Sequence, residues 1–212
     1  MKKRCAKEAL KFVPEHGIIG LGGGSTIAYL AEYVRAERPG VSVVTPSKDT
    51  KKHCEKLGIT VLLTEEVSEV KIAFDGCDQV DYQLNAYKSA GGIHTKEKII
   101  GKMAKEYMLL VDESKVVPKL FYDFPVVLEI VPEAKGYLAS KLSKMNMTYQ
   151  MRTPELMEVF IEDSKMDMGE IDNILKSFTG VVETSLFYQV ATKALVVTQN
   201  GSYMIEKEKK NG

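Results

Sequence analysis

Short apolar runs alternate with helix-like segments along the first 112 residues of the chain. The sequence predicts strands at 18–19, 41–46, 59–63, 71–74 and 107–111, and helices at 1–13, 25–37, 48–57 and 96–106. Continuous apolar strands, each followed by a helix, are typical of a parallel sheet that is covered on both faces. The pattern therefore predicts an α/β fold with a Rossmann-like, mostly parallel sheet.

The order of elements changes at residue 124. Strands are predicted at 125–131, 147–151, 156–162 and 181–187, and helices at 133–144 and 169–178. A β-α-β-β-α-β order is typical of a small ferredoxin-like unit. The sequence therefore predicts a second, α+β unit after the parallel sheet.

The segment 194–207 reads as a hairpin, in which Asn200-Gly201 favours a type I′ turn. If this hairpin returns to the first sheet, the second unit is an insertion. We therefore predict an α/β domain formed by residues 1–123 plus 194–212, with a small α+β domain inserted over 124–193.

Charge and cysteine content exclude several classes of partner. The 29 basic and 29 acidic residues cancel, so no overall field attracts the chain to nucleic acid or to a membrane surface. The longest apolar runs are far shorter than the roughly 20 residues of a membrane span. The three cysteines are too scattered for a disulfide framework or a zinc site. We expect a cytoplasmic protein.

Polar residues gather directly after predicted strands or between predicted elements at four places. These are Gly22–Thr26, Asp75–Asp78, Lys88–Glu97, and Asp112 with Lys115. In an open α/β sheet, ligands bind at the carboxyl ends of the strands, where loops and helix N-termini converge. We expect the four clusters to form one site.

The loop GLGGGST, residues 20–26, contains four glycines in five positions. It lacks the Gly-Lys-Ser/Thr of a Walker A loop, and Ser25 stands where a dinucleotide fingerprint has its third glycine. The residues favour a phosphate cup, in which backbone N–H groups and the hydroxyls of Ser25 and Thr26 face an anion. The alternative is a tight turn in which Ser25 only caps the helix.

The acidic residues also allow two interpretations. Asp75 and Asp78 either act in a site or form an Asx-type turn with solvated carboxylates. Glu97 lies in the first turn of a predicted helix, where the helix dipole favours its ionised form, and is either a base or a helix-stabilising acid. The three histidines have no spacing typical of a metal site or a catalytic triad. We expect no metal.

Taken in order, the motifs GLGGGST, PSKDT, DGCDQVD, KSAGGIHTKEKI and VDESK resemble those of the type A ribose-5-phosphate isomerases. The family pattern is roughly G-x-G-T-G-S-T, D-G-A-D-E-x-D and K-G-G-G-G-A-x-x-R-E-K, with the same internal spacing. The resemblance implies an aldose-ketose isomerase of the pentose phosphate pathway that interconverts D-ribose 5-phosphate and D-ribulose 5-phosphate through an enediolate. It also implies no cofactor and a homodimer or homotetramer, with oligomer contacts in the small domain.

Carried over by position, the resemblance implies that Glu97 is the proton acceptor. Asp75 would open the furanose ring, Asp78 would orient the sugar and hold Lys88, and Lys88 with the amides around Gly91 would stabilise the oxyanion. The residues implied to line the substrate are Gly23, Gly24, Ser25, Thr26, Asp75, Gly76, Cys77, Asp78, Lys88, Ser89, Ala90, Gly91 and Lys115.

The chain departs from the family pattern at several positions. Gly23 replaces a threonine, Gln79 a glutamate, and Ser89 and Ala90 replace glycines. A side chain at position 89 could restrict φ in the oxyanion loop. The alternative function is a non-catalytic sugar-phosphate sensor that resembles the DeoR-type effector domains. Such a sensor would keep the phosphate cup and lose the base, so the presence of Glu97 favours the enzyme.

Overall fold

A computed structural model describes residues 1–162 and 166–207. Its main sheet has six strands in the order β14-β13-β6-β3-β1-β2. The strands are β1 (His16–Leu21), β2 (Gly40–Val44), β3 (Val70–Asp75), β6 (Ala104–Asp112), β13 (Lys193–Val197) and β14 (Ser202–Glu206). All neighbouring pairs are parallel except β13 with β14. The predicted mostly parallel α/β sheet is confirmed.

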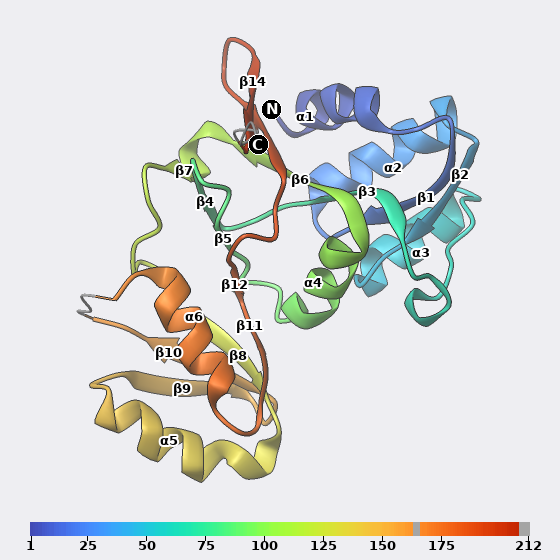
Figure 1. The fold of residues 1–212 in the computed structure, drawn as a ribbon. Coiled ribbons are helices and arrows are strands. Elements are labelled where there is room, and N and C mark those ends of the chain that lie inside the picture. Colours follow the sequence, from blue (N-terminus) through green and yellow to red (C-terminus); the bar gives the residue numbers. More distant parts are fainter. Residues whose placement is uncertain (163–165, 208–212) are drawn as a thin grey trace, which may run out of the picture.

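Four helices cover this sheet on its two faces. They are α1 (Lys2–Ala9), which continues into η1 (Leu10–Phe12), α2 (Ser25–Glu37), α3 (Lys48–Lys56) and α4 (His94–Met103). Apolar side chains of α1, α2 and α3 share one core with Ile19 and Phe74, and Ile100 of α4 packs in the core of the opposite face with Ala73. Figure 1 shows α1 and α2 across the sheet from α4. Both faces are therefore buried, as continuous apolar strands require.

The second unit is a four-stranded antiparallel sheet in the order β11-β8-β10-β9. Its elements are β8 (Val126–Ile130), η4 (Pro132–Ala134), α5 (Lys135–Lys144), β9 (Thr148–Thr153), β10 (Leu156–Phe160), α6 (Met168–Ser177) and β11 (Val181–Thr184). Both helices pack into one core with the strands. In chain order the strands are arranged 4-1-3-2, which confirms the predicted ferredoxin-like topology.

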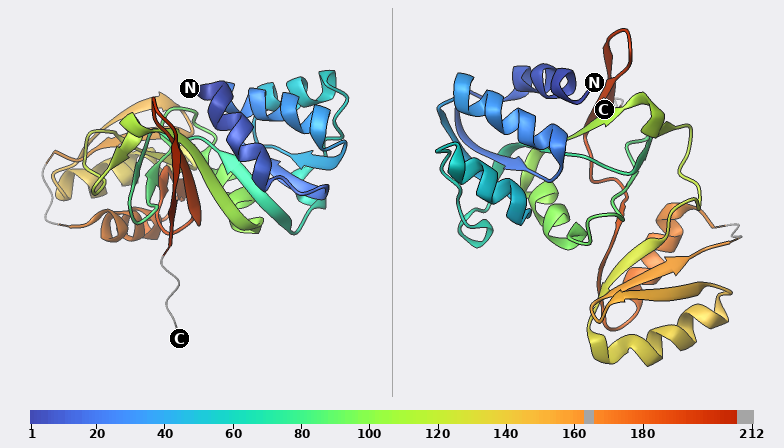
Figure 2. Two further views of the ribbon diagram at one scale, coloured as in Figure 1. Left: turned by 90° about the horizontal axis from the view of Figure 1, so that it is seen from above. Right: turned by 180° about the vertical axis from the view of Figure 1, so that it is seen from behind.

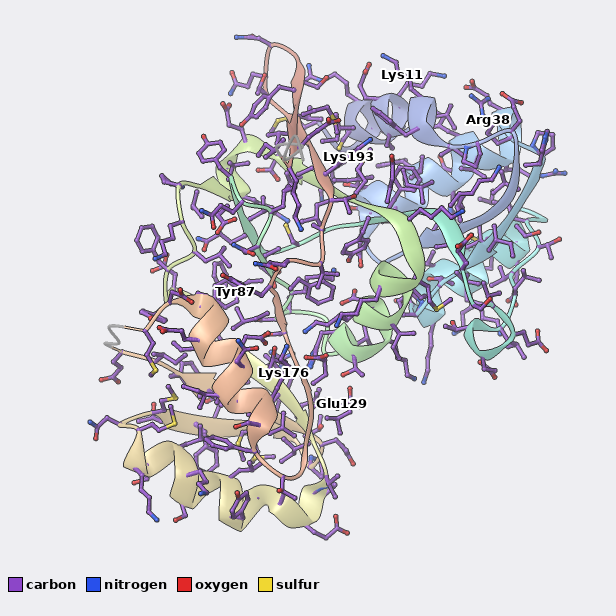
Figure 3. All side chains as sticks on the ribbon, in the orientation of Figure 1. Lys11, Arg38, Tyr87, Glu129, Lys176 and Lys193 are labelled. Atoms are coloured by element: carbon purple, nitrogen blue, oxygen red, sulfur yellow. The ribbon has the colours of Figure 1, made fainter. Side chains whose placement is uncertain are left out.

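A third, small sheet was not expected from the sequence. It contains β4 (Gln79–Asp81), β5 (Ala86–Tyr87), β7 (Val116–Val117) and β12 (Leu186–Phe187). This sheet lies between the two larger units in Figure 1 and in the right-hand view of Figure 2. Figure 3 shows Tyr87 of β5 at this junction, where its ring joins the core of the ferredoxin-like unit.

The prediction of one strand over 181–187 is wrong. The segment contains β11 and β12, which belong to different sheets. Ser185 stands between them and makes the change of sheet: its N–H donates to Val127, and its carbonyl accepts from the N–H of Lys88. The chain therefore crosses from the ferredoxin-like unit to the small sheet at this residue.

The prediction of a strand at 59–63 is also wrong. Only Val61 forms a bridge, to Val43, after which η2 (Thr64–Glu66) begins. Thr60 is exposed and Leu63 is 47% exposed, because the segment passes the open edge of the sheet beside β2 instead of its interior. The helix predicted at 96–106 begins and ends earlier, since Ala104 already belongs to β6.

The C-terminal hairpin returns to the main sheet, as predicted, because β13 pairs in parallel with β6. Its turn is not of type I′, since neither Asn200 nor Gly201 has a positive φ. Four residues, 198–201, connect Val197 to Ser202, and the hydroxyl of Thr198 accepts hydrogen bonds from the N–H groups of Asn200 and Gly201. The longer loop removes the need for left-handed residues. Residues 208–212 of the predicted domain lie outside the described residues.

No helix within residues 1–162 and 166–207 is long and apolar enough to cross a membrane.

Candidate active site

The site lies where the carboxyl ends of β1, β3 and β6, three neighbours in the main sheet, meet the segment between β5 and α4. A cavity of about 610 Å³ opens there. Its lining residues are Gly23, Gly24, Pro46, Ser47, Lys48, Asp49, Asp75, Gly76, Cys77, Asp78, Lys88, Ala90, Gly91, Ile93, Lys96, Glu97 and Lys115. All four predicted clusters contribute residues to this cavity, whereas Asp112 of the fourth cluster does not line it.

Two glycines of the first loop are required by the backbone and by Asp75. A Cβ at Gly22 would lie 1.9 Å from Asp75 Oδ1, so only glycine allows the carboxylate to lie against this strand. Gly24 has φ +92° and is the N-cap of α2, and no side chain in the described part of the chain caps this helix. Ser25 is exposed and does not act as the cap. The first turn of α2 therefore keeps N–H groups available at the cavity.

A buried lysine joins two carboxylates at the centre of the site. Lys88 Nζ lies 3.0 Å from Asp75 Oδ2 and 3.3 Å from Glu97 Oε1. It also donates a 2.6 Å hydrogen bond to the carbonyl of Gly76. Burial lowers the pKa of Lys88, but the carboxylates of Asp75 and Glu97 outweigh it and raise the pKa above its usual value. Lys88 is a fixed positive charge shared by two acids.

The pKa of the Glu97 carboxyl is raised to near neutral pH. Burial, and then the negative charge of Asp75, raise its pKa to about 7, against the lowering effect of Lys88. The position of Glu97 in the first turn of α4 is as predicted. The helix dipole was expected to favour the ionised form, but the side chain is only 8% exposed, and desolvation is the largest effect on its pKa. A carboxyl with this pKa can both accept and return a proton at neutral pH.

Asp78 does not hold Lys88, which corrects the role implied by the resemblance. Its Oδ2 accepts hydrogen bonds from the N–H groups of Ser89, at 2.6 Å, and Ala90, at 3.1 Å. The carbonyls of the same two residues accept from Arg152 of β9, at 2.9 and 3.2 Å. Asp78 and Arg152 therefore hold the active-site loop from opposite sides.

The substitution of glycine by Ser89 causes no strain in this loop. Ser89 has no positive φ, and the left-handed position is Gly92, with φ +64°. The Ser89 hydroxyl donates to the carbonyl of Pro125 at 2.7 Å and lies 2.9 Å from Ser185 Oγ. Its side chain thus turns away from the cavity toward the junction of the units.

Lys115 and Cys77 lie at the wall of the cavity. Lys115 Nζ donates a 2.7 Å hydrogen bond to the carbonyl of Cys77. Burial raises the pKa of the Cys77 thiol to about 12, so the thiol stays protonated at neutral pH and is not a nucleophile. No cluster of three or more potential metal ligands occurs in the described part of the chain.

Of the predicted site residues, Ser25, Thr26 and Ser89 do not line the cavity as the structure describes it, and the others do. Six lining residues were not singled out from the sequence: Ile93 and Lys96, which lie inside the predicted cluster Lys88–Glu97, and Pro46, Ser47, Lys48 and Asp49. Four of them follow the end of β2 and begin α3, which Ser47 caps through Thr50 N–H. The strand-end rule could have found this group, since it follows a predicted strand.

Tyr107 was also missed. Its hydroxyl donates a 3.0 Å hydrogen bond to Asp75 Oδ2 from beneath the site. It lies inside an apolar strand, where a sequence suggests only a core position.

Comparison with known proteins gives a consistent result over the whole chain. The family model of ribose 5-phosphate isomerase A (phosphoriboisomerase A) matches residues 42–201. The ribose-5-phosphate isomerase A of Thermococcus kodakarensis is 36% identical over 224 residues, which cover 98% of each chain.

Two solved structures extend this similarity to the fold. The ribose 5-phosphate isomerase A of Methanocaldococcus jannaschii superposes with a TM-score of 0.86 at 32% identity, over 97% of this chain and 98% of the other. A D-ribose-5-phosphate isomerase in complex with phospho-erythronic acid superposes with a TM-score of 0.87 at 28% identity, over 97% of both chains.

Proposed function

Because the chain belongs to the ribose-5-phosphate isomerase A family and interconverts ribose 5-phosphate and ribulose 5-phosphate, we propose that Glu97 is the base of this reaction. Family membership excludes the alternative of a non-catalytic sensor. The observation that carries the proposal is a buried carboxyl at the cavity wall, 3.3 Å from Lys88, with a pKa of about 7.

The proposed reaction moves one proton between adjacent carbons. The Glu97 carboxylate removes the proton from C2 of the open-chain aldose, the C–H electron pair forms the C1=C2 bond, and the carbonyl electrons move to O1. The O2 proton then passes to O1, and protonated Glu97 delivers its proton to C1, which leaves a ketone at C2. A base with a pKa near the operating pH is the efficient choice for both transfers.

Charge and donors around Glu97 suit the enediolate. Lys88 is buried and positive beside it, and Ala90 and Gly91 of the loop line the same cavity. Preorganised donors in a desolvated site stabilise a developing oxyanion more strongly than water does. Asp78 takes the role of holding this loop in place.

The phosphate is proposed to bind at the first loop. Support comes from the uncapped N-terminus of α2, with Gly23 and Gly24 at the cavity, because such N–H groups and the helix dipole attract anions. Asp75 is proposed to assist ring opening, since it faces the cavity beside Lys88. A related isomerase was solved with phospho-erythronic acid, which is itself a phosphorylated sugar acid.

Glu97→Gln tests the base directly. We expect kcat to fall about 10²–10⁴-fold with little change in KM, because the amide keeps the size but accepts no proton. Exchange of solvent deuterium into the sugar should fall in parallel. Glu55→Gln, an exposed helix position on α3, serves as the control with normal turnover. A folded Glu97→Gln enzyme that keeps more than roughly a tenth of the wild-type kcat would remove Glu97 from this role.

We further propose that residues 124–193 form the inserted small domain and carry contacts of a homodimer or homotetramer. Val131, Tyr137 and Val182 of this unit are apolar and 46%, 45% and 52% exposed. A monomer mass from light scattering would refute the oligomer.

The free thiols of Cys5, Cys54 and Cys77 support a reducing, cytoplasmic location, which an extracellular location found by fractionation would refute.

A further inference from the structure

We propose that Tyr107 is a positioning residue of this isomerase: its hydroxyl holds the Asp75 carboxylate and so places the Lys88 ammonium beside Glu97. The proposal rests on the proposed role of Glu97. Tyr107 does not line the cavity as described, so it acts through Asp75 and not on the substrate.

The tyrosine ring has one orientation because it is packed on several sides. Tyr107 is 1% exposed on β6. Gly101 of α4 leaves room for it, since a Cβ there would lie 3.3 Å from two ring carbons. The ring of Phe187 lies with its centre 6.0 Å away. The Tyr107 backbone N–H donates to the hydroxyl of Thr192 at 2.9 Å. This packing aims the hydroxyl at Asp75.

Each oxygen of Asp75 then has two donors. Oδ1 accepts from the N–H of Gly76 at 2.8 Å and of Gly23 at 3.4 Å. Oδ2 receives Tyr107 Oη at 3.0 Å and Lys88 Nζ at 3.0 Å. Burial, followed by the charge of Asp75, raises the pKa of Tyr107 well above its usual value. Tyr107 therefore keeps its hydroxyl proton at neutral pH and donates it to Asp75.

Removing the Tyr107 hydroxyl changes how the Lys88 ammonium is shared between Asp75 and Glu97. A buried carboxylate that loses one hydrogen bond has to take more of its stabilisation from the remaining cation. Lys88 is then drawn toward Asp75 and away from Glu97, and more of the negative charge of Asp75 is felt at Glu97. Both effects disfavour the ionised form of Glu97 and raise its pKa.

The groups that face Glu97 are Asp75 of β3, Asp78 of the following loop and Lys88 after β5. Lys96 and Lys115 line the same cavity, and Cys77 stays a neutral thiol. Tyr107 is the group that approaches Asp75 from β6. A change confined to the Tyr107 hydroxyl removes none of these side chains.

The test compares pH profiles of kcat/KM for wild type and Tyr107→Phe, which removes one oxygen and keeps the ring. We expect the acid limb to move up by roughly half a pH unit to one unit, and kcat/KM at pH 7 to fall roughly 2- to 5-fold, because less of Glu97 is ionised at that pH. Tyr87→Phe is the matched control, because Tyr87 is equally buried but its hydroxyl donates to Met168 Sδ at 3.2 Å in the ferredoxin-like unit. Its profile should match that of the wild type.

A second variant gives a shift of the opposite sign and also covers failure of Tyr107→Phe to fold. Tyr107→3-fluorotyrosine makes the hydroxyl a stronger donor, so the acid limb should move to lower pH. Profiles of Tyr107→Phe or Tyr107→3-fluorotyrosine that superimpose on the wild type, while Glu97→Gln is inactive, overturn the positioning role alone. A Glu97→Gln enzyme that keeps its turnover overturns the assignment of the base instead.

Discussion

Glu97→Gln should make the protein more stable above neutral pH while it removes most of the activity. At pH 8 the site contains the two carboxylates of Asp75 and Glu97 around one ammonium, that of Lys88. The side chain of Glu97 is only 8% exposed, so water screens this charge poorly. An amide at position 97 removes the excess negative charge and keeps the shape.

The magnitude follows from the pKa of Glu97. The folded state raises this pKa from 4.5 to about 7, a shift of about 2.5 units, and each unit corresponds to about 1.4 kcal/mol. Because the folded protein binds the proton more tightly than the unfolded chain, the stability contributed by protonated Glu97 is fully present below pH 4.5. It is lost as the pH rises through about 7, to a total of about 3 kcal/mol. Glutamine does not titrate and loses nothing.

The assay is urea unfolding of wild type and Glu97→Gln at pH 4.5 and pH 8.5, at one protein concentration so that any assembly contributes equally. Between these pH values, the difference in the free energy of unfolding should shift in favour of the variant by up to about 3 kcal/mol. The figure is an upper value, since the amide also replaces one contact of Lys88. Glu55→Gln, exposed on α3, should show no such shift. A variant that is destabilised equally at both pH values would mean that Glu97 is an ordinary helix acid and that the burial argument is wrong.

Two other substitutions test the walls of the site. Gly24→Val should raise KM for ribose 5-phosphate at least about tenfold, because φ +92° at the start of α2 strains any β-branched residue; a folded variant with unchanged KM places the phosphate elsewhere. Arg152→Met should lower kcat and speed hydrogen exchange at the Ser89 and Ala90 amides, because Arg152 donates hydrogen bonds to the carbonyls of these two residues. The control Arg35→Met, on the exposed face of α2, should change neither quantity. Normal exchange in a slow Arg152→Met enzyme would show that Arg152 does not act through this loop.

The long periodic elements could be predicted from the sequence. The helix at 25–37 has the predicted bounds, because a full turn-by-turn apolar stripe leaves little choice of structure. The small central sheet could not be predicted, since β5 and β12 have only two residues each and show no measurable periodicity. The strand expected at 59–63 failed for a related reason: its apolar residues resemble a strand, but tertiary position leaves it at the edge with a single bridge.

The residues at the strand ends could be predicted from local sequence rules, but the ion pairs and the ionisation states of the buried side chains could not. Residues after β1, β3 and β6 converge as the strand-end rule requires. The partner of Lys88 was expected to be Asp78, but Lys88 pairs with Asp75 and Glu97. The sequence shows that these residues lie near one another, but it does not show which way each side chain points. The ionisation of Glu97 depends on desolvation, which no helix position reveals.

The ferredoxin-like unit contacts elements of the active site at two points. Lys98, the residue after Glu97 on α4, is buried and donates hydrogen bonds of 2.8 Å to Glu183 Oε1 and to the carbonyls of Thr184 and Leu186. These acceptors lie in the segment that leads from β11 to β12. A buried ammonium with three acceptors is costly to displace, so α4 is fixed against the strand that leaves the ferredoxin-like unit.

Arg152 makes the second connection, from β9 to the carbonyls of the loop that Asp78 holds by its N–H groups. The helix that carries Glu97 and the loop of Ser89 and Ala90 are therefore both joined by charged groups to the ferredoxin-like unit. Lys98 and Arg152 do not themselves line the cavity, yet each contacts an element that forms its wall. The main sheet brings Glu97, Lys88 and Asp75 to one edge, and the hydrogen bonds of Lys98 and Arg152 add two links between the ferredoxin-like unit and this edge.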